Sequence, residues 1–362
     1  MDERVVDIAG TVGCTEGPLR VSYNSRDLLI YALGIGCCGT DDGQPGDADM
    51  RYLYEGHPNF SAFPTYPLAL PCKGTSSDVV PFPGPTLTLL PTVLRDRVDP
   101  GAVLHYDQSF KIQHSLDPRG AELEMWSEAV GFYQRRGGVL LRTRNVLTDR
   151  SGRVYCRATS GVFIRGLKIP SDAGPPLHSR PMPARPGSVP DAAASVTVSR
   201  EQALLYRLSG DYNAIHANFE AARSAGLDGP ILHGLCSLGI AARQVLRCFC
   251  ESDPSRLKSL YCRFSRPVRP GDELEVRMWK RVYDEMEGGA PPEVKGRYQN
   301  ARDDQETARR RAASHDGRGA ISSEVFQVRF AVFPKTIGSP RVVLDGSALV
   351  THHGEEFSRS RL

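Results

Sequence analysis

Alternation of apolar and polar residues gives the first part of the chain the pattern of a β-sheet. A short helical pattern over 25–33, with Ser25 as its predicted N-cap, comes first. The strand-like runs that follow are 102–114, 121–133, 138–148 and 153–164. Turn signals such as Asp117-Pro118-Arg119-Gly120 separate these runs, which predicts an antiparallel meander.

The same plan appears a second time further along the chain. A helical pattern runs from 231 to about 249, and strand-like runs follow it at 259–266, 273–282, 293–299 and 323–333. A polar, arginine-rich segment at 300–320 interrupts them, and its composition predicts a disordered surface loop. Two units of ~150 residues with one order of elements predict a single fold that occurs twice.

These patterns predict an α+β fold in which long antiparallel sheets wrap long central helices. Seven prolines between 167 and 193 indicate an extended, unpacked linker between the two halves. The predicted boundaries are 1–20 for an N-terminal segment, 21–166 for the first half, 167–193 for the linker, 194–334 for the second half and 335–362 for a polar, mobile tail.

Composition narrows the class of protein without identifying it. Hydrophobic residues make up 40% and charged residues 24% of the 362 residues, which is typical of a soluble globular protein. The net charge of +3 is too small to favour a nucleic-acid partner. The sequence contains no apolar run of ~18 residues, so we expect no membrane span. The N-terminus lacks the basic-then-apolar pattern of a secretory signal.

Cysteine and glycine patterns argue against two common kinds of site. The nine cysteines include no Cys-x-x-Cys pair, which favours reduced, buried thiols in an intracellular protein. The nine histidines are scattered, so we predict no metal. The glycines of 34–39 match a dinucleotide fingerprint, but residues 40–46 cannot begin the helix that a pyrophosphate needs. We interpret these glycines as a helix end and a loop.

One short segment carries the candidate chemistry. Asp211, Asn213 and His216 fall within six residues, and together they can hold and polarise one water molecule. Gly234 stands at the start of the second predicted helix, where a backbone N–H can stabilise negative charge on a carbonyl oxygen. An Asp and an Asn beside a glycine are also typical of a simple turn. The whole set suits addition of water to, or its removal from, a carbonyl-conjugated double bond.

Residues 206–243 resemble the signature of the R-specific 2-enoyl-CoA hydratases (hydratase 2, within the MaoC-like dehydratases). The resemblance covers 21–166 and 194–334 and implies a double hot-dog fold. Ala214, where the family has proline, and the 300–320 insertion depart from the pattern. The other similar stretches are Ser25-Arg26-Asp27 to Gly34, Tyr54-Glu55-Gly56, Phe60 with Pro64-Thr65, Val103-Leu104-His105 with Gln108, Arg263-Phe264 with Pro267-Val268 and Pro270-Gly271, and Met278-Trp279-Lys280.

The resemblance implies reversible syn hydration of trans-2-enoyl-CoA to (3R)-3-hydroxyacyl-CoA. In that reaction the Gly234 N–H would bind the thioester oxygen, and Asn213 would orient the water or a catalytic side chain. We expect His216 to assist attack by the water while Asp211 handles the proton at the alpha carbon. No redox or metal cofactor is expected, because nothing is oxidised and coenzyme A is part of the substrate.

The sequence also offers candidate residues for binding coenzyme A and indicates how the two halves divide their roles. Coenzyme A carries phosphates, and Arg243, Arg263 and Lys280 are candidates to meet them, although each is also explained as a surface charge. Glu55 lies in a family-like motif and is either structural or catalytic. The first half contains no Asp-x-Asn-x-x-His, so we expect one active site per chain, with 21–166 binding the acyl chain.

The ending Ser360-Arg361-Leu362 is a variant of the peroxisomal Ser-Lys-Leu address. It predicts a peroxisomal enzyme that an import receptor recognises. A homodimer is a separate expectation. The chain has no dehydrogenase-like region upstream, so we expect a stand-alone hydratase.

One alternative is a hot-dog hydratase or dehydratase on another acyl thioester, which the peroxisomal ending disfavours. The other is a non-catalytic acyl-CoA-binding protein, which would gain nothing from a costly polar cluster.

Overall fold

The computed structural model describes residues 6, 8, 10–41, 44–45, 48–84, 90–177, 188–282, 324–335 and 342–352. The predicted strand at 293–299, the 300–320 insertion and the address Ser360-Arg361-Leu362 lie outside the described residues. No helix in the described ranges is long and apolar enough to cross a membrane.

The first half consists of five long strands and several short helices. The strands are β1 (Thr15–Asn24), β4 (Val103–Ile112), β5 (Gly120–Arg135), β6 (Gly138–Thr148) and β7 (Val154–Arg165). The short elements are α1 (Ser25–Gly34), β2 (Thr40–Asp41), β3 (Gln44–Pro45), α2 (Met50–Leu53), α3 (Leu70–Lys73) and α4 (Thr92–Arg95), with 3₁₀ turns at Tyr66–Leu68 and Pro100–Ala102.

The second half repeats this inventory around a longer helix. Its strands are β8 (Ala192–Thr197), β9 (Leu257–Phe264), β10 (Glu273–Val282), β11 (Glu324–Pro334) and β12 (Leu344–His352). Its helices are α5 (Gln202–Tyr206), α6 (Phe219–Ser224) and α7 (Gly234–Phe249), with 3₁₀ turns at Arg207–Ser209, Ala214–His216 and Pro254–Arg256.

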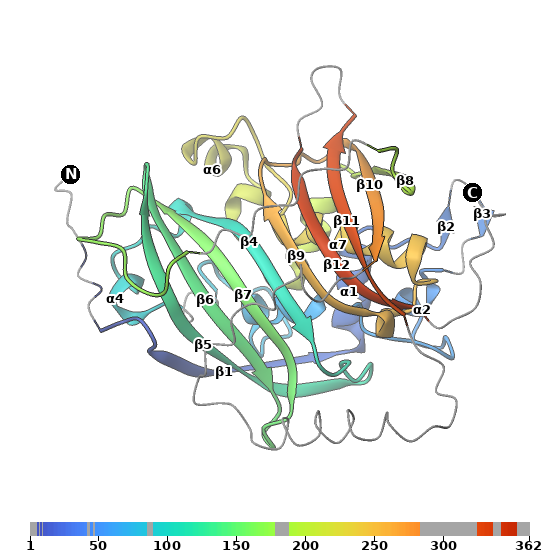
Figure 1. The fold of residues 1–362 in the computed structure, drawn as a ribbon, viewed down its shortest axis with the longest axis horizontal. Coiled ribbons are helices and arrows are strands. Elements are labelled where there is room, and N and C mark those ends of the chain that lie inside the picture. The colour runs from blue at the N-terminus through green and yellow to red at the C-terminus, as the bar shows by residue number, and fades with distance from the viewer. Residues whose placement is uncertain are drawn as a thin grey trace.

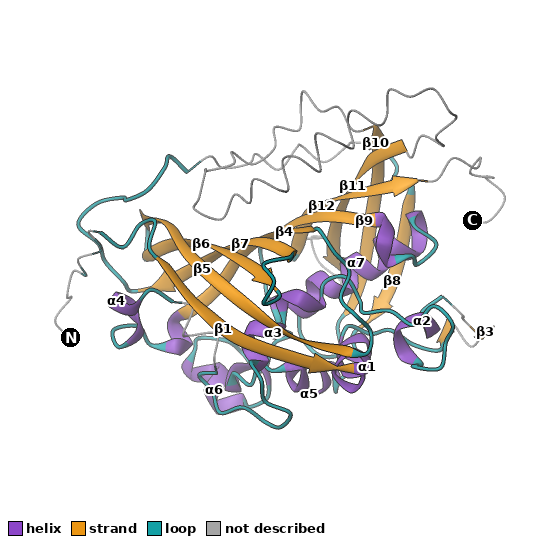
Figure 2. Ribbon diagram, turned by 90° about the horizontal axis from the view of Figure 1, so that it is seen from below, coloured by secondary structure: helices purple, strands orange, loops and turns teal. Residues whose placement is uncertain are grey.

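All ten long strands join in one antiparallel sheet. Its order is β1-β5-β6-β7-β4-β9-β12-β11-β10-β8, so the second five strands mirror the first five (Figure 1). The halves meet where β4 pairs with β9, from Asp107 opposite Arg263 to Lys111 opposite Ser259. The main helices lie on one side of this sheet (Figure 2). The predicted α+β double hot-dog architecture is confirmed.

The central helices differ in length. α7 has 16 residues and is buried along most of its length, as expected for a helix that a sheet wraps. α1 has only 10 residues. Its N-cap is Asn24 rather than Ser25: the Asn24 side chain accepts from the Asp27 N–H at 3.2 Å, and Asp27 accepts from the Asn24 N–H at 3.0 Å. Gly36, with φ of +83°, follows the helix, which confirms a helix end and loop there.

Four segments differ from the sequence-based predictions. Residues 344–352, expected in a mobile tail, form β12 between β9 and β11, so the second half extends beyond 334. β1 and β8 were not predicted and form the two edges of the sheet. The described part of the linker is packed rather than loose, because Leu167 and Ile169 are buried and Ala173 pairs with Phe132 of β5.

Candidate active site

The catalytic loop follows α5 and is held by tight backbone packing. Gly210 has φ of +120°, and a Cβ atom there would lie 2.5 Å from the Lys73 nitrogen, so only glycine fits. Asp211 accepts a hydrogen bond from the Asn213 N–H at 3.2 Å, and Asn213 accepts one from the Ile215 N–H at 3.2 Å. Both side chains therefore form the side chain–backbone hydrogen bonds that are typical of a turn. These bonds hold the loop that carries His216.

His216 is held in one tautomer by the backbone. Its Nδ1 lies 2.8 Å from the Ile231 carbonyl oxygen. A carbonyl can only accept, so Nδ1 must carry the proton and Nε2 must hold a free lone pair. The side chain is only 7% exposed, and burial lowers the pKa of His216 below its usual value. At neutral pH the ring is therefore uncharged and suited to act as a base.

His233, which was not among the predicted site residues, is stacked on His216. Their ring centroids are 3.6 Å apart and the ring planes differ by 23°. His233 Nε2 donates to the Asp211 carbonyl oxygen at 3.0 Å. Burial and the neighbouring His216 lower the pKa of His233 to about 3, so it stays neutral and holds the loop in place. The signal that could have identified it is its position directly before Gly234.

Asp211, His216 and His233 form a compact polar cluster. A ring nitrogen of each histidine and a carboxylate oxygen of Asp211 all lie within 4.8 Å of one another. A single water can therefore form hydrogen bonds to two of these atoms. Two imidazoles and a carboxylate also have the composition of a metal site. The two rings are stacked, however, so their in-plane lone pairs lie in nearly parallel planes, whereas zinc requires the lone pairs of its ligands to converge tetrahedrally on one point. The expectation of a metal-free site stays a prediction.

Gly234 is the first residue of α7, and its N–H belongs to the first turn, which has no acceptor within the helix. The positive end of the helix dipole adds to the attraction for a developing negative charge at this point. A Cβ atom at Gly234 would press against the Phe264 ring at 3.3 Å, so a larger residue would disturb the cavity wall. Gly234 is thus placed to bind a carbonyl oxygen.

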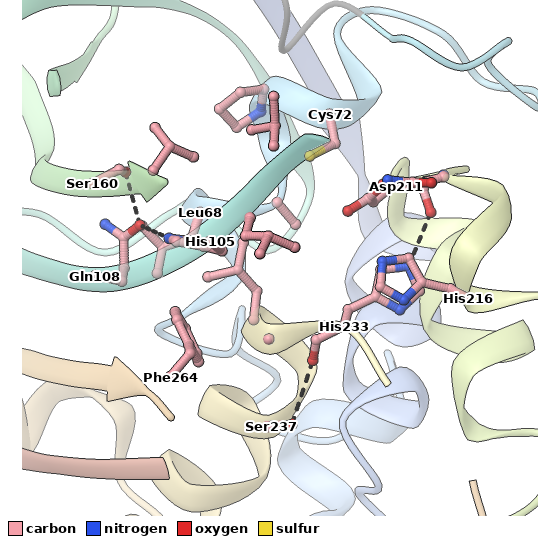
Figure 3. A pocket seen from close by; sticks show the side chains of 18 of the residues that line it. Leu68, Cys72, His105, Gln108, Ser160, Asp211, His216, His233, Ser237 and Phe264 are labelled. Carbon is pink, nitrogen blue, oxygen red and sulfur yellow. Dashed lines mark hydrogen bonds between the residues drawn. The ribbon is translucent and has the colours of Figure 1, made fainter. Parts of the chain in front are cut away.

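A cavity of about 490 Å³ is lined by the four predicted catalytic residues, of which Figure 3 shows Asp211 and His216. Asp211, Asn213, His216 and Gly234 all line it, so the structure brings them together, while their individual roles stay predictions. Both halves contribute to the walls. Most of the first-half lining is apolar and includes Leu90, Val103, Met125, Leu147, Ala158 and Val162.

The predicted coenzyme A contacts do not line this cavity. Arg243 is 5% exposed and donates through Nε to Asp49 at 2.7 Å, so it forms a buried ion pair and is not at the mouth. Arg263 is exposed and lies over the Tyr106 ring, and Lys280 of β10 lies over the ring of Phe326 on β11. Glu55 is exposed in the turn after α2.

Arg266, which was not predicted, is exposed and lines the cavity. It follows the end of β9 by two residues, and its exposure places a positive charge beside solvent at the cavity. Its sequence signal was weak, because a single arginine in an arginine-rich chain does not stand out.

The wall opposite the catalytic loop carries a second polar group of residues, from the first half (Figure 3). His105 Nε2 lies 3.1 Å from Gln108 Oε1, and Ser160 Oγ donates to the same oxygen at 2.8 Å. Burial lowers the pKa of His105, so this imidazole is also neutral. In the sequence His105 and Gln108 appeared only as part of a resemblance.

Comparison with known proteins gives a consistent result in both halves. Residues 21–166 match the family model described as MFE-2 hydratase 2 N-terminal domain, and residues 181–299 match the MaoC like domain. Enoyl-CoA hydratase 2, peroxisomal, from Arabidopsis thaliana is 34% identical over 269 residues, which are 72% of this chain and 82% of that protein.

Solved structures support the same fold. The MaoC-like dehydratase from Phytophthora capsici aligns with a TM-score of 0.69 at 34% identity, over 96% of this chain and 98% of that one. A Mycobacterium tuberculosis protein described as a double hotdog fold aligns with a TM-score of 0.54 at 14% identity, over 94% and 96% of the two chains. The second likeness concerns the fold alone.

Proposed function

The chain belongs to the hydratase 2 family of MaoC-like dehydratases, and from this membership we propose that it hydrates trans-2-enoyl-CoA reversibly to (3R)-3-hydroxyacyl-CoA. One observation carries the proposal. A single cavity combines an unprotonated His216 Nε2, the Asp211 carboxylate and the N–H of Gly234 in the first turn of α7. These are a base, a second acid–base group and a donor for a carbonyl oxygen.

The reaction begins with a water held between His216 and Asp211. The beta carbon of the substrate is electrophilic because the thioester carbonyl withdraws electrons from it. His216 Nε2 accepts a proton from the water as the oxygen bonds to that carbon. The electron pair of the double bond moves toward the thioester, and enolate charge builds on its oxygen.

Gly234 and Asp211 complete the reaction. The Gly234 N–H stabilises the enolate oxygen, and one such donor is worth about 10²–10³ in rate. The proton that His216 took from the water passes by way of the Asp211 carboxylate to the alpha carbon, on the face where the water was added. A net H and OH are thereby added, and His216 and Asp211 both return to their starting protonation states. Since no electrons leave the substrate, we expect neither a redox nor a metal cofactor.

We also propose that the enzyme works in peroxisomes, with an import receptor as partner. The support is the name of the Arabidopsis relative together with the Ser360-Arg361-Leu362 ending. Removal of these three residues should leave the enzyme active but cytosolic, and continued import after truncation would show that the ending is coincidental. A homodimer is a further proposal, which size-exclusion chromatography with light scattering tests directly.

Purified protein mixed with crotonyl-CoA or 2-decenoyl-CoA tests the proposed reaction. We expect the enoyl absorbance to fall and chiral analysis to give the (3R) product. A mainly (3S) product, or no turnover at any chain length, would contradict the assignment as an R-specific enoyl-CoA hydratase. Turnover restricted to a carrier-protein thioester would favour a different hot-dog hydratase, and binding without turnover would favour an acyl-CoA-binding protein.

A further inference from the structure

The first-half wall of the cavity is more polar than a hydrocarbon tail requires. Five side chains with hydrogen-bonding groups line it: His105, Gln108, Thr143, Asn145 and Ser160. They stand on β4, β6 and β7, which are neighbours in the sheet. Placing polar groups against a purely aliphatic ligand costs free energy. An acyl chain made only of methylene groups therefore gives no reason for them.

A β-bulge in β4 brings two of these side chains together. His105 pairs with Val162 of β7, and Asp107 pairs with the adjacent Gly161, so Tyr106 is an extra residue on β4. In a regular strand, residues three apart point to opposite faces. The extra residue instead turns His105 and Gln108 to the same face, where their side chains are hydrogen-bonded (Figure 3).

The hydrogen bonds of Gln108 determine what the group offers to a ligand. Gln108 Nε2 donates to the carbonyl oxygens of Ser109 at 2.9 Å and Thr159 at 3.3 Å, which fixes the orientation of the amide. Oε1 is therefore the acceptor for Ser160, whose hydroxyl donates its only proton to it. The Ser160 oxygen can then only accept from a further partner.

Two more residues continue this polar row across the sheet. Ser160 is paired with Gln108 on one side and with Thr143 of β6 on the other. Asn145 lies two residues beyond Thr143 and therefore faces the same side. Within the described part of the chain, the buried Asn145 Oδ1 has no hydrogen-bond partner. A buried acceptor without a partner is unfavourable, and a turn of the Asn145 side chain, which lines the cavity, would let a hydroxyl group of a ligand donate to it.

We propose that Thr143, Asn145 and Ser160 form a subsite for an oxygen substituent on the acyl chain. A hydroxyl group fits best, because it can donate to one of these side chains and accept from another. The preferred substrates are then 2-enoyl-CoAs that carry a hydroxyl group beyond the double bond. This inference rests on the proposed function, since the catalytic loop across the cavity must act on the thioester end of the same molecule (Figure 3).

The test compares 2-decenoyl-CoA with analogues hydroxylated at successive carbons from the fifth to the tenth. Wild-type enzyme should show a higher kcat/KM for at least one hydroxylated analogue than for the plain chain. Thr143→Val and Asn145→Leu should each lower the ratio of kcat/KM for that analogue to kcat/KM for the plain chain by about threefold to tenfold. Thr159→Val is the matched control, because Thr159 neighbours Ser160 on β7 and points to the opposite face of the sheet.

The outcomes separate the subsite from the reaction itself. If wild-type enzyme prefers plain 2-decenoyl-CoA to every analogue, the subsite is overturned while the proposed function stands, whether or not the variants fold. Equal losses on both substrates in variants with unchanged melting temperature overturn it in the same way. If no enoyl-CoA is turned over, the proposed function fails and the subsite fails with it.

Discussion

Two substitutions in the catalytic loop separate chemistry from folding. Asp211→Asn and His216→Gln keep the size and hydrogen-bonding capacity of each side chain but remove its acid–base function. We expect each to lower turnover by about 10²–10⁴ with little change in melting temperature. Steady-state kinetics and thermal melting on the same samples check this. A variant that retains more than a tenth of wild-type activity would remove that residue from the catalytic set.

The pH dependence of activity should report the neutral His216. Burial places the pKa of His216 below its ordinary value, so the base stays unprotonated at neutral pH. We expect kcat/KM to be flat around neutrality and to fall only when the pH drops below the range where an exposed histidine titrates. A profile of kcat/KM against pH measures this. A decline that begins above neutral pH would contradict the assignment of His216 as the base.

The free energy of unfolding should also fall as the pH is lowered, because of His233. The pKa of His233 is lowered to about 3 in the fold, while the unfolded chain has the ordinary value of about 6.5. Below that value the unfolded state binds the proton and the folded state does not. The contribution to stability is therefore complete above about pH 6.5 and is lost as the pH falls toward 3. Denaturant unfolding across this range, with His233→Asn as comparison, measures the slope.

Gly234 can be tested through its N–H without removing the helix. Gly234→Pro deletes the donor at a position where helices accept proline, so we expect turnover to fall by about 10²–10³. Gly234→Ala retains the N–H and adds only a Cβ that presses on Phe264, which makes it the control for crowding. A folded proline variant as active as the alanine variant would place the donor elsewhere.

At the scale of elements, the strands of the first half should decide which acyl chains fit. Ala158 of β7 lines the cavity, and Ala158→Phe would shorten the space for a tail while leaving the catalytic loop untouched. We expect kcat/KM to fall about tenfold or more for 2-decenoyl-CoA, by loss of apolar burial, and to stay near wild type for crotonyl-CoA. Ala193→Phe, at an exposed site on β8, is the control. Equal losses on both substrates would make the first half a structural partner only.

Elements with regular alternation could be predicted from the sequence, and those shaped by close packing could not. β6 and β10 begin and end where their alternation predicts. β12 was missed because Asp345, Gly346 and Ser347 are typical of a turn. Gly346 is required because a Cβ there would overlap the Phe330 side chain, and that contact depends on the tertiary structure. β8 begins with three alanines, which have low strand propensity.

The same distinction applies to the candidate site. Asp211, Asn213 and His216 could be predicted because one short loop carries all three. The group of His105, Gln108 and Ser160 could not, because it depends on a bulge and on pairing between β4 and β7. Arg243 was misplaced for a similar reason, since its partner Asp49 is 194 residues away in the sequence.

At the scale of the whole molecule, both halves line one cavity, and only one of them contributes the catalytic loop. We therefore expect one acyl-CoA to bind per chain. Calorimetric titration of the inactive Asp211→Asn variant with 2-decenoyl-CoA should give a stoichiometry of one. A value of two, with equal affinities, would mean that the first half holds a site of its own.

The mirrored strand order has a consequence for how this protein can change. In an assembly of two identical copies, one sequence supplies both the surface that binds the acyl chain and the surface that carries the catalytic loop. A substitution that enlarges the binding surface then also alters the catalytic surface. Here the two mirrored units are separate stretches of one chain, joined where β4 pairs with β9. A substitution in 21–166 occurs once and leaves the catalytic loop as it was. Selectivity for the acyl chain can therefore evolve independently of the catalytic machinery.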